Sequence, residues 1–274
     1  MIKFWRKMKM LKEVVGELFE NRQRLFRLAL YENKAQSSGT LLGNMWDFLN
    51  PTLQILVYWF VFSVGLKVLP DRGGYNYTVW MITGILPWLT INKAITSGAL
   101  SIHKSAGIIK NVKMPLSLIP AKSVVGALIS HGYMLIVLAI VLILNKVQVS
   151  FYFIQIIYYM ICAVYFLIGF SLLTSAINAV FKDFQNILSP CIRLIFYISS
   201  VVWPLDTLSE EIQWILHINP LLYIIEGYRN SLLYQTGFWS VWEYTVMFWF
   251  ISTVIFILGC YMHTKLRERF IDLI

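Results

Sequence analysis

Charged residues are scarce in this sequence. Of its 274 residues, 14% are Asp, Glu, Lys or Arg, whereas soluble domains average about 25%. Hydrophobic residues make up 58% of the chain. A soluble domain of this length cannot bury that much apolar surface, so the composition excludes one. It favours a lipid bilayer as the solvent for much of the chain.

The residues that metal sites and disulfides need are also few. The three cysteines, Cys162, Cys191 and Cys260, have no CxxC spacing, which argues against a disulfide framework and a zinc site. The four histidines are scattered and form no H-E-x-x-H motif, so we expect no metal in this chain.

Motifs for ATP binding and for nucleophilic catalysis are missing as well. The sequence has no GxxxxGK[ST], the motif that cradles nucleotide phosphates, and no G-x-S-x-G elbow. Carboxylates avoid the centres of the apolar runs, which disfavours a proton-coupled carrier. We therefore expect no catalytic residue and no cofactor here, and a conduit that takes its energy from another protein.

Long apolar runs dominate what is present. About 20 apolar residues in a helix are enough to cross the hydrocarbon core of a bilayer, and six segments meet this need. The expected fold is thus an all-α integral membrane protein with six transmembrane helices in a domain spanning 36–264. The predicted spans are Asn44–Leu66, Tyr77–Ser97, Ala121–Leu144, Phe151–Val180, Ile187–Trp203 and Val241–Met262.

The distribution of Lys and Arg predicts that both termini are cytoplasmic. With the N-terminus inside, the inner segments hold sixteen of these residues and the outer loops hold four, namely Lys67, Arg72, Lys146 and Arg229. Basic residues concentrate on the cytoplasmic side of membrane proteins. The net charge of +9 is therefore attributed to topology and to anionic lipids, not to nucleic acid.

Three segments outside the spans have their own patterns. Residues 1–35 combine apolar residues at helical spacing with basic residues, which predicts an interfacial amphipathic helix. It acts either as an anchor or as a gate. Residues 206–237 are too short for two more spans, and the Asn219-Pro220 pair predicts a helix start there. We expect short re-entrant helices in this region and a cytoplasmic tail over 265–274.

The loop after the second predicted span is amphipathic and basic. We expect a short cytoplasmic helix near 101–113, ended by Pro115. It is either an ordinary basic loop that holds topology or a docking element for a soluble partner. The candidate docking residues are Ile102, His103, Lys104, Ile108, Ile109 and Lys110.

Cations and tyrosines within the spans are candidates for substrate contact. Lys93, Lys122 and Arg193 lie in or beside predicted spans. They either contact an anionic headgroup or extend to the cytoplasmic interface. Aromatic residues of the fourth span either line a path for sugar rings or pack in the core. These residues are Tyr158, Tyr159 and Tyr165.

Three local segments carry a resemblance to a known family. They are Arg27-Leu-Ala-Leu-Tyr-Glu-Asn-Lys34, Leu42-Gly-Asn-Met-Trp-Asp-Phe-Leu-Asn-Pro51 and Lys113-Met-Pro-Leu-Ser-Leu-Ile-Pro120. The chain resembles ABC-2 type polysaccharide-export permeases over essentially its whole length. The first segment is most similar to wall teichoic acid translocation permeases, with O-antigen exporters as near sisters.

The resemblance implies a homodimer that works with two copies of a cytoplasmic ABC ATPase, which would bind ATP and Mg²⁺. It implies that the N-terminal helix is a gate, that 101–113 is the coupling helix, and that the cargo is a polymer on a polyprenyl diphosphate. The implied location is a plasma membrane, in a Gram-positive bacterium if the cargo is teichoic acid. We add the inference that Arg24, Arg27 and Lys34 guide the diphosphate.

Three alternatives stay open. An O-antigen or capsular polysaccharide exporter would differ only in its cargo. A drug or small-lipid exporter of the same superfamily fits the N-terminal segment less well. A membrane enzyme acting on lipid-linked sugars would need catalytic carboxylates or histidines, which the sequence does not group together.

Overall fold

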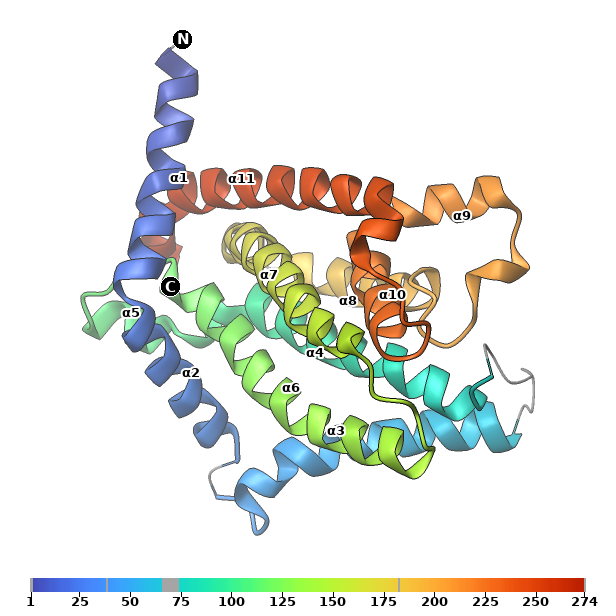
Figure 1. Cartoon of the computed structure of the whole chain (residues 1–274). Coiled ribbons are helices and arrows are strands. Elements are labelled where there is room, and N and C mark those ends of the chain that lie inside the picture. Colours follow the sequence, from blue (N-terminus) through green and yellow to red (C-terminus); the bar gives the residue numbers. More distant parts are fainter. Residues whose placement is uncertain (1, 38, 66–73, 182, 274) are drawn as a thin grey trace.

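The fold is helical throughout the described residues. The computed structural model describes residues 2–37, 39–65, 74–181 and 183–273 (Figure 1), of which 84% are helical and none forms a strand. The α-helices are α1 (Ile2–Glu20), α2 (Arg22–Ser37), α3 (Trp46–Trp59), α4 (Tyr77–Lys104), α5 (Ala106–Asn111), α6 (Leu118–Leu144), α7 (Gln155–Val180), α8 (Phe184–Ile198), α9 (Glu210–His217), α10 (Pro220–Leu232) and α11 (Trp242–Leu273).

The long helices form one bundle with two distinct ends. Helix α4 packs against α6 and α7, and α7 packs against α11. Figure 1 shows α1, α2, α5 and the C-terminus at one end, and α9 and α10 at the other. We call these the α5 end and the α10 end. In the predicted topology the α5 end is cytoplasmic.

Small residues let the long helices approach closely. A Cβ built on Gly259 of α11 would lie 2.2 Å from the carbonyl oxygen of Gly169 on α7, and one on Gly98 of α4 would lie 2.3 Å from Ser171 Oγ. In lipid, helix association depends on such close packing because the hydrophobic effect gives little drive between apolar helices. These glycines therefore join α4, α7 and α11 into one unit.

Within the part of the chain that the structure describes, three helices are long and apolar enough to span a membrane, namely Leu118–Leu144, Phe151–Val180 and Phe238–Phe270. Two shorter apolar helices, Phe48–Phe62 and Phe184–Ile198, coincide with the first and fifth predicted spans. The number of six spans stays a prediction.

Several predicted boundaries were wrong. The second predicted span does not stop at Ser97, because α4 continues to Lys104. The fifth is shorter than predicted and ends at Ile198. Helix α11 runs on to Leu273, so residues 265–273 continue the last helix beyond the predicted span, and their cytoplasmic location stays a prediction. Hydropathy marks the apolar part of a helix, whereas its hydrogen-bonded turns continue beyond the hydrocarbon.

The segment predicted as one N-terminal helix forms two helices, because a turn at Asn21 interrupts it. Val14 on α1 packs with Leu172 and Phe256 of α7 and α11. On α2, Leu25 packs with Leu118 and Ala121 of α6. The two halves bury different faces against different helices, which one straight helix cannot do.

The region between α8 and α11 does contain two short helices, as predicted. Helix α10 begins at the Asn219-Pro220 pair, where the Asn219 side chain accepts a hydrogen bond from the Leu221 backbone N–H at 3.0 Å. This side-chain cap and the proline at the first position follow the predicted chemistry. Ile224 and Ile225 are fully buried, so α10 is part of the core. Its position relative to a membrane remains a prediction.

Candidate functional site

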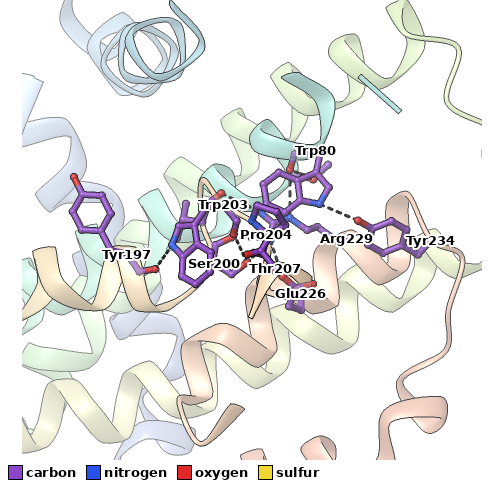
Figure 2. Close-up of polar contacts among 11 residues, drawn as sticks. Trp80, Tyr197, Ser200, Trp203, Pro204, Thr207, Glu226, Arg229 and Tyr234 are labelled. Atoms are coloured by element: carbon purple, nitrogen blue, oxygen red, sulfur yellow. Dashed lines mark hydrogen bonds and ion pairs between the residues drawn. The ribbon is translucent and has the colours of Figure 1, made fainter. Parts of the chain in front are cut away.

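A fully buried arginine holds the α10 end together. Arg229 on α10 donates hydrogen bonds to the carbonyl oxygens of Ser200 (2.8 Å) and Val201 (2.9 Å), and Figure 2 shows Arg229 beside Ser200, Glu226 and Trp80. Its Nη1 also lies 2.7 Å from Glu226 Oε1, and its guanidinium stacks 3.5 Å from the Trp80 ring centroid. A buried charge needs such a set of partners to offset its desolvation.

This arrangement joins three elements that are distant in sequence. Arg229 connects α10 to the turn after α8, where Ser200 has a positive φ of 53°, and to α4 through Trp80. Space for the guanidinium comes from Gly84, where an added Cβ would lie 2.2 Å from Arg229 Nη2. The sequence interpretation counted Arg229 only as an outer-loop cation and did not predict its burial; its side of the membrane stays a prediction. The i,i+3 spacing of Glu226 and Arg229 was the available signal for the pair.

A second buried polar chain lies in the bundle. The His131 Nδ1 on α6 lies 2.7 Å from Thr90 Oγ1 on α4, and its Nε2 lies 2.8 Å from the Tyr228 hydroxyl on α10. All three side chains are buried. An intramembrane histidine usually has a function or a partner. Here both ring nitrogens have partners, so His131 ties α10 to α4 and α6.

A polar cleft opens on one face of α4. It has a volume of about 680 Å³ and lies among α2, α3, α4 and α6. Lys93 reaches into it and donates a hydrogen bond to Ser130 Oγ at 2.6 Å. The other polar lining residues are Glu32, Asn50, Gln54, Asn92, Thr96, Ser97 and Lys104. So many polar groups on a helix of an apolar bundle indicate contact with water or with a polar ligand.

A smaller cleft of about 290 Å³ shares the same α4 wall. Asn92 and Thr96 line both clefts, and Arg193 on α8 lines the smaller one together with Tyr58 and Trp88. Lys93 and Arg193, predicted separately, are therefore brought to adjacent clefts. The polar stripe at Asn92, Lys93, Thr96 and Ser97 was missed at the sequence level, although its i,i+4 spacing could have revealed it.

The other predicted headgroup residues lie elsewhere. Lys122 is buried and paired with Glu32 at 3.1 Å, so it connects α6 to α2. Arg24, Arg27 and Lys34 are exposed along α2 and do not line either cleft. The structure thus places Lys93 in the larger cleft and Arg193 in the smaller one. Lys104, which was predicted to dock a partner, also lines the larger cleft.

The predicted helix near 101–113 is divided into two parts. Ser101–Lys104 is the last turn of α4, and α5 covers only Ala106–Asn111. Ile102 is 1% exposed and packs in the core, whereas Ile108 is 37% exposed. His103 donates a hydrogen bond to the Asn178 carbonyl oxygen at 2.9 Å. Ile102 therefore belongs to the bundle interior, and His103 is half-buried against α7.

A depression of about 540 Å³ adjoins α5 on the side of α11. Ile109, Lys110 and Lys113 line it together with Arg267 and Glu268 of α11. Ile108 precedes Ile109 in α5 and is also exposed. Of the predicted docking residues, Ile108, Ile109 and Lys110 therefore remain at the surface near this depression.

Charged residues also attach α1 at this end. Arg267 donates to Glu13 Oε1 (3.0 Å) and to Glu17 Oε1 (2.7 Å). The Ser117 hydroxyl, just before α6, donates to the other oxygen of Glu17. One cluster therefore links α1, the end of α11 and the chain that leaves α5. No sequence pattern predicts it, because Ser117 and Arg267 lie 100 or more residues from the Glu17 side chain that they contact.

The predicted tyrosines occupy three different environments. Tyr158 accepts a hydrogen bond from Trp249 Nε1 at 3.0 Å and stacks on Phe238. Tyr165 donates to Thr253 Oγ1 at 3.3 Å. Tyr159 is fully buried and lines a pocket at the α10 end. Packing explains Tyr158 and Tyr165.

Together these features define a class of protein. Long apolar helices enclose a polar, cationic cleft, a basic surface lies at one end, and a cluster of buried hydrogen bonds closes the other. Among the described residues, no group of three or more His, Cys, Asp or Glu side chains is placed to hold a metal ion. This is the architecture of a membrane transport subunit.

The comparisons with known proteins identify the family. The sequence model of the ABC-2 type transporter matches residues 23–233, and the chain belongs to that family. It is 28% identical over 243 residues to the O-antigen export system permease protein RfbA of Klebsiella pneumoniae, covering 88% of this chain and 91% of that one. A Myxococcus xanthus protein of the same name is 28% identical over 224 residues, covering 81% and 84%.

A more distant relative is named for a different polysaccharide. The polysialic acid transport protein KpsM of Escherichia coli is 21% identical over 209 residues, covering 75% of this chain and 80% of that protein.

Proposed function

We propose that this chain is the membrane permease of an ABC exporter for a lipid-linked polysaccharide. The observation that carries the proposal is the polar cleft on α4, because Lys93 and Lys104 bring positive charge to a path otherwise walled by apolar helices. A polyprenyl diphosphate presents an anionic headgroup, which lysine ammonium groups bind through charge-assisted hydrogen bonds. Membership of the ABC-2 type transporter family supports a transport role.

O-antigen or capsular polysaccharide is the cargo that the relatives favour. The RfbA relatives are named for O-antigen export, and KpsM is named for polysialic acid transport. This evidence supports the alternative cargo of the sequence interpretation better than wall teichoic acid. These relatives come from Gram-negative bacteria, so the proposed host need not be Gram-positive. The proposed location is the plasma membrane, with both termini cytoplasmic.

The proposed energy source is a separate cytoplasmic ATPase that binds ATP and Mg²⁺. Its docking surface would be α5 with the end of α11, where Ile108 and Ile109 supply apolar contacts beside Lys110 and Lys113. Two copies of each subunit are the proposed assembly. The Arg267–Glu13–Glu17 cluster lies next to this surface, so movement of α5 would reach α1 directly.

Reconstitution tests the proposal. The chain and its partner ATPase are placed in proteoliposomes with a fluorescently labelled, undecaprenyl-diphosphate-linked O-polysaccharide. We expect ATP-dependent appearance of the label on the opposite leaflet, measured by its accessibility to a membrane-impermeant quencher. A matched sample with a hydrolysis-deficient ATPase controls for leakage. Equal transfer in both samples would contradict the proposal.

A further inference from the structure

A second pocket lies at the α10 end, apart from the clefts on α4. It has a volume of about 260 Å³ and is enclosed by α4, α7, α9, α10 and α11. Its walls combine aromatic rings with amides and carboxylates, and its described lining residues include no lysine or arginine, whereas Lys93 and Lys104 line the α4 cleft. Six of the lining residues are Tyr159, Gln213, Tyr223, Glu226, Asn230 and Tyr244.

One buried polar group in this pocket has no partner. Tyr159 is 0% exposed, and its hydroxyl lies near the Tyr223 hydroxyl without a hydrogen bond of normal geometry to any of the described residues. Buried tyrosine hydroxyls normally find a partner, and an unsatisfied one is costly. The Tyr159 ring packs directly against Gly227 of α10. A Cβ added to Gly227 would lie only 2.1 Å from Tyr159 Cε1, so the ring is closely confined. The Tyr159 ring is therefore held in the pocket wall, with its hydroxyl just behind the pocket surface.

The aromatic walls are also held rigidly. The His217 and Tyr244 rings stack at 3.8 Å with an angle of 14° between them. The Tyr223 hydroxyl lies 2.8 Å from Thr245 Oγ1, and its ring stacks on Phe248 at 4.8 Å. Rigid aromatic walls with a few placed polar groups are typical of small-ligand sites.

Charge selects the class of ligand. Glu226 keeps one carboxylate oxygen on Arg229, and Asp206 lines the same pocket, so an anionic group such as a phosphate meets two carboxylates. A hydroxyl-rich neutral ligand instead finds acceptors in these carboxylates and both donors and acceptors in Gln213 and Asn230. Its apolar ring face can pack on the aromatic walls.

We propose that this pocket binds one neutral pyranose unit of the exported glycan, on the outer side of the membrane. The proposal rests on the proposed function, which supplies the glycan and the orientation. A sugar hydroxyl would complete the hydrogen bonding of Tyr159. Such a site would hold the emerging polymer beside α10 and oppose its return.

Binding is tested with simple sugars on the complete complex in lipid nanodiscs. The probes are methyl α-D-mannopyranoside, methyl β-D-galactopyranoside and methyl N-acetyl-β-D-glucosaminide, followed by saturation-transfer NMR. We expect saturable binding of at least one glycoside and none of inorganic phosphate. Tyr159→Phe removes only the hydroxyl and should weaken binding about fivefold, the effect of one hydrogen bond.

Matched variants make the result specific. Tyr165→Phe removes a hydroxyl two turns along α7, outside the pocket, and should leave the affinity unchanged. Gln213→Ala, which changes a residue on α9 at the pocket mouth, should weaken binding as Tyr159→Phe does. No saturable binding of any glycoside, or equal affinity in the wild type and both pocket variants, would overturn the proposal.

A competition experiment identifies the source of the sugar. Delipidated polysaccharide from the host surface should displace the bound glycoside, and failure to displace it would refute the assignment to the exported glycan. The proposed transport function has a separate readout. If the wild-type complex transfers polymer with ATP but binds no glycoside, the result contradicts only the proposed sugar site. If it binds glycosides but transfers no polymer, the result contradicts only the proposed transport function.

Discussion

Removing the charge of Arg229 should destabilise the α10 end more than any exposed substitution. Arg229→Met keeps an unbranched apolar side chain but leaves the carbonyl oxygens of Ser200 and Val201 without their donors. It also leaves Glu226 without its partner at 2.7 Å. Breaking a buried ion pair by removing one member costs about 3–5 kcal/mol. Arg229→Lys keeps the charge but cannot reproduce the planar fork, so we expect a smaller cost of about 1–3 kcal/mol.

Thermal unfolding of the purified protein in detergent measures the effect. For chains of 150–250 residues, 1 kcal/mol shifts Tm by about 2–4 °C, so Arg229→Met should lower Tm by on the order of 10 °C. The control is Arg193→Met, at an exposed position on α8, where surface substitutions usually change stability by about 0.5 kcal/mol or less. Equal Tm values for the two methionine variants would refute the structural role of the Arg229 contacts.

Three further predictions follow from other parts of the bundle. Replacing Ile108 and Ile109 together with Asp should abolish co-purification of the ATPase while membrane insertion stays intact; retained partner binding would contradict docking at α5. Lys93→Ala should lower substrate-stimulated ATPase activity about tenfold or more, the effect of one hydrogen bond to a charged group, and leave basal activity unchanged; equal loss of both would assign Lys93 a structural role. Gly259→Ala places a Cβ 2.2 Å from a backbone oxygen of α7 and should cost about 1–3 kcal/mol by overpacking. Its control is Gly132→Ala, where a Cβ meets nothing within 4 Å.

Apolar runs and capping residues were sufficient to predict most of the helices. The runs over α6, α7 and α11 are uninterrupted, so hydropathy alone located them. The Asn219-Pro220 start of α10 followed from local chemistry, because a side-chain cap and a first-turn proline act within three residues. Signals of this kind need no knowledge of tertiary contacts.

The interior of the candidate site could not be predicted in the same way. Ile102 was expected on an exposed docking face, but its burial depends on Phe270, which lies more than 160 residues later in the sequence. Lys122 was a candidate for substrate contact until its pairing with Glu32 of α2 was visible. Which face of a helix is covered depends on contacts between distant segments, and a single sequence does not contain them.

Depleting this chain in its native host tests the central claim most directly. Cells are labelled with a lectin or antibody against their surface polysaccharide, before and after permeabilisation, and lipid-linked precursor is quantified from the same cells. Our account predicts loss of the surface signal and accumulation of polyprenyl-diphosphate-linked polymer inside. Normal surface polysaccharide, without internal accumulation, would contradict the assignment as its export permease.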